Sequence, residues 1–420
     1  MAREKMMKDD VVYNHHDNEI RSHLILASCA VDDFKAMEKS FGEELTVIGS
    51  LRDGADQRLW FKKWLAGEGN FARSPGFSTH ELGLSIDFDF EDKKQISWLS
   101  ENSTKFNFYN DVKSEPWHFT HSADGKFEKL GFVFYAPYEE KVKGPTYDYA
   151  CRILNEQGYS AVSIKNFEEL NDELALMSSA CDKVLFLAHE ALLNIISSRD
   201  FVRDNVYHYS GVLIDKYSAI SIAEGLGYPT VKSIINPKST EDIFNQLGDT
   251  IVQKPREHFT HRGKLVKIKH EGDDISNRDR WMYQSYGGRT HPPYDHIRVN
   301  ALFGVPIMYY GTRNLTDDKI VLPFGMSIFK GDVENVELFK IDDDDPIVRE
   351  CSELSARISD EIQCGMIGVD VVLDGDGRYS IVEVNVNIIA IVWNIEEFDS
   401  RISRGKLIAA AALNKLSGLN

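Results

Sequence analysis

Residues 368–385 read GVDVVLDGDGRYSIVEVN, and this stretch decides the fold of the C-terminal half. Two runs rich in β-branched residues flank an Asp-Gly-Asp-Gly turn, a pattern that predicts a β-hairpin. A symmetrical turn places Asp370 opposite Ile381, and residues 381, 383 and 385 share a face because strand side chains alternate. Asp370, Glu383 and Asn385 then point the same way and offer the oxygen ligands that magnesium takes.

An ordinary edge hairpin also places polar residues on one face, so the pattern alone has a plainer explanation. However, Glu383 and Asn385 lie in a strongly apolar strand, beside Val382 and Val384. A buried acid needs a partner, and a cation is the natural one. The hairpin therefore predicts a magnesium site.

The chain resembles the ATP-grasp superfamily, whose last strands carry this order of Asp followed by Glu-x-Asn. The resemblance spans about residues 145–415. Four earlier segments follow the order of motifs in that superfamily: 215–218, 251–255, 281–286 and 295–299. It implies that Lys216 and Lys254 contact ATP phosphates. It also implies that Gln284 and Tyr286 meet adenine and that Arg298 faces an acyl phosphate.

What the resemblance implies is a Mg²⁺- and ATP-dependent carboxylate–amine ligase. The layout is most similar to ligases that add glutamate to a ribosomal protein and to similar peptide ligases. The expected phosphate loop, residues 255–264, has one glycine where relatives have several. Arg256, Arg262 or Lys264 would then compensate for weaker backbone contacts to phosphate.

A second group of chemistry-bearing residues lies between positions 78 and 118, in the stretches STHELGLSID and SEPWH. A catalytic zinc takes three protein ligands and keeps one position for water. His80, Asp87 and His118 would supply two nitrogens and one carboxylate. Glu115, three residues before His118, is placed to take a proton from zinc-bound water and pass it to a leaving amine.

Each of these residues has a plainer explanation when taken alone. The chain has 13 histidines, and Asp87 begins the acidic run 87–92, which is typical of a solvated edge. The joint pattern resembles the zinc D,D-carboxypeptidases and D,D-dipeptidases of bacterial cell walls and vancomycin resistance. Their motif, SxHxxGxAxD followed by ExWH, differs here only at Ser85, where alanine is usual. Gly83 would let the chain turn between the first two ligands.

The same resemblance covers about residues 20–137. Residues 50–57 resemble the Ser-x-x-Arg…Gln segment of that family, which implies that Arg52 polarises the scissile carbonyl or its oxyanion. A domain of this fold that has lost its activity is the main alternative to a working zinc site.

Composition limits the partners. The chain has 420 residues with 48 Lys and Arg against 66 Asp and Glu, a net charge of −18. Such a surface repels phosphate backbones and anionic lipids, so we expect neither nucleic acid nor a membrane as partner. No apolar run suits a transmembrane helix, the start is polar, and the five cysteines lack CxxC spacing. These features predict a cytoplasmic protein. The two resemblances imply small peptides or amino acids as substrates, and a homo-oligomer is left open.

The expected organisation has four parts. They are a polar arm at 1–20, an α+β zinc D,D-peptidase-like domain at 21–140, an α/β region with a parallel sheet at 141–210, and an α/β ATP-grasp domain at 211–420. The charged stretch 138–145, closed by Gly-Pro, is the expected linker. We also expect the two catalytic regions to have separate cores.

The leading hypothesis is a bifunctional peptide-tailoring enzyme that hydrolyses one peptide bond at zinc and forms another with ATP. Trimming and then extending the tail of one peptide would need the two sites to open to a common side, although simple gene fusion explains the pair equally well. The first alternative is a ligase whose zinc domain only recognises the peptide. The second is a binding or regulatory protein that keeps both folds without turnover.

Overall fold

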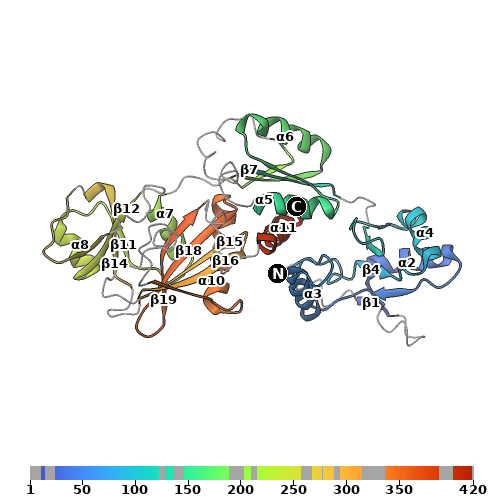
Figure 1. The fold of residues 1–420 in the computed structure, drawn as a ribbon, viewed down its shortest axis with the longest axis horizontal. Coiled ribbons are helices and arrows are strands. Elements are labelled where there is room, and N and C mark those ends of the chain that lie inside the picture. Colours follow the sequence, from blue (N-terminus) through green and yellow to red (C-terminus); the bar gives the residue numbers. More distant parts are fainter. Residues whose placement is uncertain are drawn as a thin grey trace.

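The computed structural model describes residues 11–14, 24–122, 128–135, 146–188, 203–209, 215–256, 267–276, 278–287, 294–314, 336–386 and 401–418. The expected linker and the expected phosphate loop beyond Arg256 lie outside these residues. Figure 1 shows the N-terminal part at one end of the long axis, a parallel sheet with α5, α6 and α11 in the middle, and two further sheets toward the other end.

The N-terminal part is built on a four-stranded antiparallel sheet in the order β3-β4-β6-β5. Its strands are β3 (Val47–Gly49), β4 (Ser85–Phe88), β5 (Phe108–Tyr109) and β6 (His118–His121). The helices around it are α2 (Ser28–Phe41), α3 (Gly54–Ala66), α4 (Lys93–Asn102) and the 3-10 helix η2 (Ser103–Phe106). Phe34, Phe88 and Phe119 fill the core between the sheet and these helices.

Part of the predicted polar arm is a strand. β1 (Val11–Asn14) pairs antiparallel with β2 (Ile25–Ala27). The prediction of an arm at 1–20 is therefore wrong for these four residues. Their sequence, Val-Val-Tyr-Asn, begins with β-branched and aromatic residues that fit a pleated surface.

The middle part contains a parallel sheet in the order β10-β9-β7-β8. Its strands are β7 (Leu130–Tyr135), β8 (Ser160–Ile164), β9 (Lys183–Ala188) and β10 (Val206–His208), and its helices are α5 (Thr146–Glu156) and α6 (Phe167–Ala180). The predicted parallel sheet is thus confirmed.

The predicted boundary at residue 140 is wrong, because β7 belongs to this parallel sheet and the first region ends before Leu130. Every residue of β7 is buried, as expected for a central parallel strand covered on both faces. The boundary was predicted from the charged residues that follow β7. The composition of that stretch does not indicate which sheet the preceding strand joins.

The C-terminal part contains two antiparallel sheets. The four-stranded sheet β11-β14-β12-β13 consists of β11 (Ser233–Ile235), β12 (Thr250–Pro255), β13 (Lys267–His270) and β14 (Trp281–Ser285), with α8 (Thr240–Leu247) and η6 (Arg278–Arg280) beside it. The five-stranded sheet β17-β16-β15-β18-β19 consists of β15 (Tyr294–Leu302), β16 (Val305–Asn314), β17 (Val336–Phe339), β18 (Met366–Leu373) and β19 (Tyr379–Val386). Two helices, α7 (Lys216–Gly225) and α10 (Pro346–Ile362), share a core with one face of the five-stranded sheet.

Helix α11 (Arg401–Ser417) connects the parts. It packs against α5, and one core cluster joins both helices to Trp64 and Ala72 of the N-terminal part. Lys406 Nζ donates to the Trp64 carbonyl, and Asn414 Nδ2 donates to Ser74 Oγ. The N-terminal sheet keeps its own core, but the expectation of fully separate cores is wrong at this contact.

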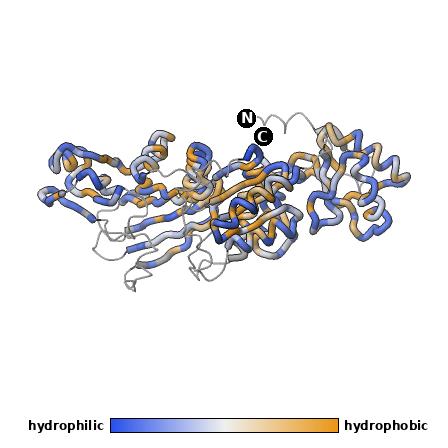
Figure 2. Tube along the Cα trace, turned by 90° about the horizontal axis from the view of Figure 1, so that it is seen from above, coloured by the Kyte–Doolittle hydropathy of each residue, from blue (hydrophilic) through white to orange (hydrophobic). Residues whose placement is uncertain are grey.

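The hydropathy pattern follows this packing. Figure 2 shows hydrophobic segments gathered in the middle of the molecule, whereas hydrophilic and hydrophobic segments alternate toward its two ends. Among the residues described, no helix is both long and apolar enough to cross a membrane.

Candidate functional site

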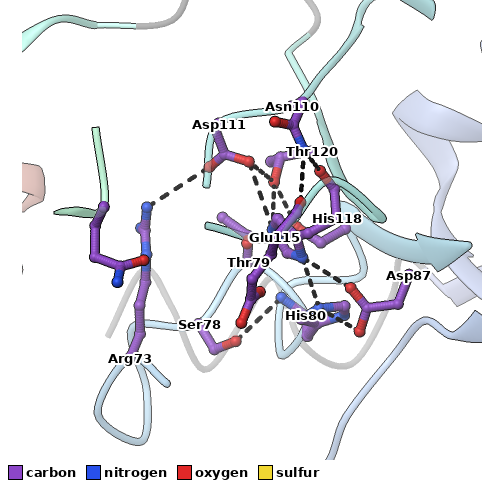
Figure 3. A network of polar contacts seen from close by, with 12 residues as sticks. Arg73, Ser78, Thr79, His80, Asp87, Asn110, Asp111, Glu115, His118 and Thr120 are labelled. Atoms are coloured by element: carbon purple, nitrogen blue, oxygen red, sulfur yellow. Dashed lines mark hydrogen bonds and ion pairs between the residues drawn. The ribbon is translucent and has the colours of Figure 1, made fainter. Parts of the chain in front are cut away.

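Three predicted zinc ligands come together in the N-terminal sheet, and we call His80, Asp87 and His118 the histidine cluster. Asp87 of β4 pairs directly with His118 of β6, so their side chains emerge on one face. His80 precedes β4 in an irregular segment. Its Nε2 lies 3.2 Å from His118 Nδ1 and 3.3 Å from Asp87 Oδ2, and His118 Nδ1 lies 2.9 Å from Asp87 Oδ1 (Figure 3).

These separations suit a metal ion. In a tetrahedral zinc site with bonds of about 2.0–2.2 Å, ligand atoms lie about 3.3–3.6 Å apart. The two histidine nitrogens and the carboxylate oxygens are close to this spacing, and both rings are buried. The donor set is also one that zinc prefers, so the residues present fit the ion.

The ring nitrogens that face away from the cluster have partners of their own. His80 Nδ1 lies 2.7 Å from the Ser50 carbonyl oxygen, which can only accept, so this nitrogen carries the proton. His118 Nε2 lies 3.1 Å from Thr120 Oγ1. Such partners fix the tautomer and leave the other nitrogen free as a ligand. Sequence reasoning missed Ser50 and Thr120 in this role, although Thr120 lies two residues after His118 on the same strand face.

The loop that carries His80 is held from both ends. Glu81 Oε2 accepts from the backbone nitrogens of Gly76 and Ser78, at 2.7 and 3.3 Å. Gly83 has φ +66°, and a Cβ there would lie 2.9 Å from the backbone nitrogen of Ala27. Only glycine fits this turn, which confirms the predicted role of Gly83.

Two predicted catalytic residues lie at the same place. Figure 3 shows Glu115 among the residues of the histidine cluster. Burial raises the pKa of Glu115 to about 7, which suits a group that exchanges a proton near neutral pH. Arg52 Nη2 lies 3.7 Å from Asp87 Oδ2, and its Nη1 donates to Gln57 Oε1 at 2.9 Å.

The C-terminal hairpin forms, but its register differs from the one predicted. Asp370 lies opposite Glu383, and Ile381 pairs with Val371. A bulge leaves Val382 outside the ladder. The bulge puts Ile381 in the core with Val371, while Glu383 shares a face with Asp370. The prediction that residues 381, 383 and 385 share one face is therefore wrong for Ile381.

Four charged residues around this hairpin form what we call the lysine cluster: Lys216, Lys254, Asp370 and Glu383. Lys216 Nζ of α7 lies 2.9 Å from Glu383 Oε1, and Lys254 Nζ of β12 lies 3.3 Å from Glu383 Oε2. Lys254 Nζ also donates to the Val382 carbonyl at 2.7 Å, using the backbone that the bulge frees. Burial lowers the pKa of Lys254, and the nearby charge of Lys216 adds to this effect.

Asp370 is the second acid of the lysine cluster. Arg298 Nη1 lies 3.4 Å from Asp370 Oδ2, His296 Nε2 lies 3.1 Å from Oδ1, and Asn385 Nδ2 donates to Oδ2 at 2.7 Å. Burial acts to raise the pKa of Asp370, but Arg298 and His296 outweigh it and hold that pKa below its ordinary value. Asp370 is therefore a buried carboxylate held in its ionised form, which suits a cation ligand.

The structure places the two expected adenine residues on and beside β14. Gln284 Nε2 donates to the Val382 carbonyl at 3.1 Å and to Ser233 Oγ at 2.9 Å, so it joins the two C-terminal sheets. Tyr286 follows the end of β14 and is half-buried. Contact of either residue with adenine stays a prediction.

Arg256 and His296 are two further charged or titratable residues near the lysine cluster. Arg256 Nε forms an ion pair with Asp215, the N-cap of α7, next to Lys216. His296 was missed by sequence reasoning, although the alternation of strand side chains puts it on the face of Arg298, two residues away.

A cavity of about 1000 Å³ lies elsewhere, between Phe77, residues 303–306, α10 and α11, and no predicted site residue lines it.

No protein-family model matches the sequence, and no curated protein is significantly similar to it. Solved structures that match part of this chain include the ATP-grasp ligase PsnB complexed with minimal precursor, with 14% identity, a TM-score of 0.41, and 68% of this chain and 100% of that chain covered. D-cycloserine synthetase DcsG has 14% identity and a TM-score of 0.39, covering 67% and 98%. N5-carboxyaminoimidazole synthetase from Staphylococcus aureus, complexed with ADP, has 14% identity and a TM-score of 0.38, covering 62% and 72%.

Proposed function

We propose that the C-terminal part is an ATP-dependent carboxylate–amine ligase that activates a carboxylate as an acyl phosphate. The observation that carries this proposal is the convergence of Lys216 and Lys254 on Glu383, opposite Asp370. These groups come from α7, β12, β18 and β19. Chain segments more than a hundred residues apart therefore meet at one charged centre.

The charge balance supports a ligand that brings both phosphate and a cation. Lys216, Lys254 and Arg298 place three cations beside the two carboxylates of Asp370 and Glu383. Lysines paired with a carboxylate in this way are poised to exchange it for phosphate oxygens. Asp370, Glu383 and Asn385 would hold Mg²⁺, which neutralises phosphate charge when bound.

The remaining steps fall to residues of the chain. Lys216 and Lys254 would hold the nucleotide phosphates, and Arg298, kept in place by Asp370, would orient the anionic carboxylate beside them. Gln284, which bridges β11 and β19, would keep the two sheets at a fixed separation. The substrate that carries the carboxylate and the substrate that carries the amine would each be a small peptide or an amino acid, as the resemblance to peptide ligases implies.

The test is ADP release with Mg²⁺ and mixtures of amino acids and short peptides, followed by mass spectrometry of the products. A ligase turns over repeatedly, with release of ADP and phosphate, when both a carboxylate and an amine are present, and a product appears whose mass equals their sum minus water. ATP binding without ADP release in any mixture would favour the alternative of a regulatory or binding protein.

We also propose zinc-dependent hydrolysis of a peptide bond at the histidine cluster. The observation that favours it is the spacing of 2.9–3.3 Å among the ligand atoms of the three side chains. The Ser50 carbonyl and Thr120 Oγ1, which face the outward nitrogens of the two rings, add to this support. Zinc would supply a polarised water when bound. Glu115 would accept the proton, and Arg52 would stabilise the developing oxyanion.

Zinc content and hydrolysis of D,D-dipeptides and other C-terminal peptides test this second proposal. Zinc without hydrolysis would favour the alternative in which the N-terminal part only recognises a peptide. Direct transfer between the sites has no support from their placement. Figure 1 shows β4 and β19 on opposite sides of α11, so a peptide trimmed at one site would reach the other through solvent.

A further inference from the structure

Arg73 belongs to neither sequence motif, yet it lies at the junction of two chains of contacts that end at residues of the histidine cluster. Figure 3 shows the first of these chains, from Arg73 through Asp111 to His118. It sits in the irregular segment between α3 and β4, with its side chain 17% exposed. Arg73 Nη2 donates to Tyr159 Oη at 3.0 Å and lies 3.8 Å from Asp111 Oδ2.

The first chain of contacts runs from the Arg73 guanidinium to His118. Asp111 Oδ1 accepts from Thr120 Oγ1 at 2.8 Å and lies 3.5 Å from His118 Nε2. Thr120 Oγ1 is itself 3.1 Å from that nitrogen. Asp111 therefore orients the ring of His118, and Arg73 holds Asp111.

The second chain of contacts runs from the Arg73 backbone to Asp87. The Arg73 carbonyl accepts from Gln57 Nε2 at 2.5 Å, and Gln57 is fully buried. Gln57 Oε1 accepts from Arg52 Nη1, and Arg52 Nη2 faces Asp87 Oδ2. A shift of Arg73 would therefore reach two of the three ligands.

Tyr159, the hydrogen-bond partner of Arg73, lies outside the N-terminal part. It directly precedes β8 of the parallel sheet, and its ring packs edge-on against Phe132 of β7. The same loop makes a second contact across the boundary, where Ser114 Oγ donates to Gln157 Oε1 at 2.8 Å. Ser114 touches neither Asp111 nor Arg73 through any hydrogen bond between described residues.

We propose that Arg73 is a positioning residue of the histidine cluster and that Tyr159 of the neighbouring parallel sheet holds it, so that the metal site is completed across the boundary between the two regions. This inference rests on the zinc proposal above. It gives a physical reason for the two regions to occur in one chain that does not require transfer of a substrate between their sites.

The experiment measures the zinc affinity of the full chain by competition with a chromogenic chelator. Tyr159→Phe removes one hydroxyl from a packed ring, and we expect the zinc dissociation constant to rise roughly tenfold or more, within the range for outer partners of metal ligands. Arg73→Met should weaken zinc as well, because it removes the cationic Nη2 group that contacts both Tyr159 Oη and Asp111 Oδ2. ATP turnover should be unchanged in both variants, which checks that they fold.

Ser114→Ala is the matched control, since it removes the other polar contact across the same boundary. We expect it to bind zinc like the unaltered chain. Unchanged affinity in Tyr159→Phe would overturn the inference, and so would equal weakening in Ser114→Ala, which would mean general docking. Absence of zinc from the unaltered chain would overturn the zinc proposal and this inference together, whereas the first two outcomes leave the zinc proposal intact.

Discussion

The histidine cluster and the lysine cluster are assembled in different ways. The three residues of the histidine cluster come from residues 80–118, on two neighbouring strands and the loop before them. The lysine cluster takes its members from residues 216–383, on a helix, a strand of one sheet and two strands of another. One site is local to a small sheet, and the other exists only when two sheets and a helix dock.

This difference affects what each site requires. The ligands of the histidine cluster are oriented by a cross-strand pair and by hydrogen bonds to Ser50 and Thr120. The lysine cluster depends on the Val382 carbonyl, to which Lys254 and Gln284 both donate from the other sheet. We therefore expect changes at one site to leave the other functional.

The largest expected effect is on hydrolysis. Glu115→Ala should lower the hydrolytic rate by roughly 10²–10⁴-fold, because a general base is lost. Zinc content should remain that of the unaltered chain, since Glu115 is not among the three ligands. Rates of peptide cleavage and metal analysis of the same preparation check this. Parallel loss of zinc and rate would contradict the assignment of Glu115 as a base.

The next effect concerns the lysine cluster. Lys254→Ala should lower ATP turnover by roughly 10²–10³-fold, because a cation that clamps phosphate is removed from a buried site. Lys267→Ala is the control, since Lys267 lies on β13 of the same sheet but is exposed. ADP release measures both. Similar losses in the two variants would contradict a specific role of Lys254 in ATP turnover. Loss of zinc in Lys254→Ala would show that the two clusters are not independent.

A smaller effect, on the stability of the fold, is expected from a substitution in the loop before β4. Gly83→Ala should lower the free energy of unfolding by about 1–3 kcal/mol, from strain at positive φ plus contact with the Ala27 backbone. Gly76→Ala is matched, because Gly76 has φ +83° but no atom within 4 Å of its added Cβ. Denaturant unfolding should show the larger loss for Gly83→Ala. Equal losses would mean that the close approach to Ala27 contributes nothing.

The smallest effect is expected at the bridge between the two C-terminal sheets. Gln284→Ala removes donors to Val382 and Ser233, and a net loss of about 1 kcal/mol would raise the KM for ATP roughly fivefold. The rate at saturating ATP should change less than KM. Steady-state kinetics separate these quantities, and an unchanged KM would argue against a role for this bridge in nucleotide binding.

The sequence by itself determined which residues meet in the histidine cluster and that residues 368–385 form a hairpin. The residue types of His80, Asp87 and His118, with the resemblance to the zinc D,D-peptidase motif, were enough to predict that the three side chains lie together. The β-branched runs around the Asp-Gly turn were enough to predict the hairpin with Asp370 and Glu383. Strand alternation and turn preferences act over a few residues, so they can be read from the chain.

Only the tertiary structure decided the register of the C-terminal hairpin, the boundary between the first two regions and the long-range partners of the site residues. The bulge at Val382 changes which residues face the cluster, and nothing in the residue order marks its position. β7 joins the parallel sheet because its apolar faces are covered there, although a charged stretch follows it. The contacts of Lys216 with Glu383 and of Tyr159 with Arg73 arise from packing between distant segments. Such packing depends on how whole surfaces fit together, which local patterns do not encode.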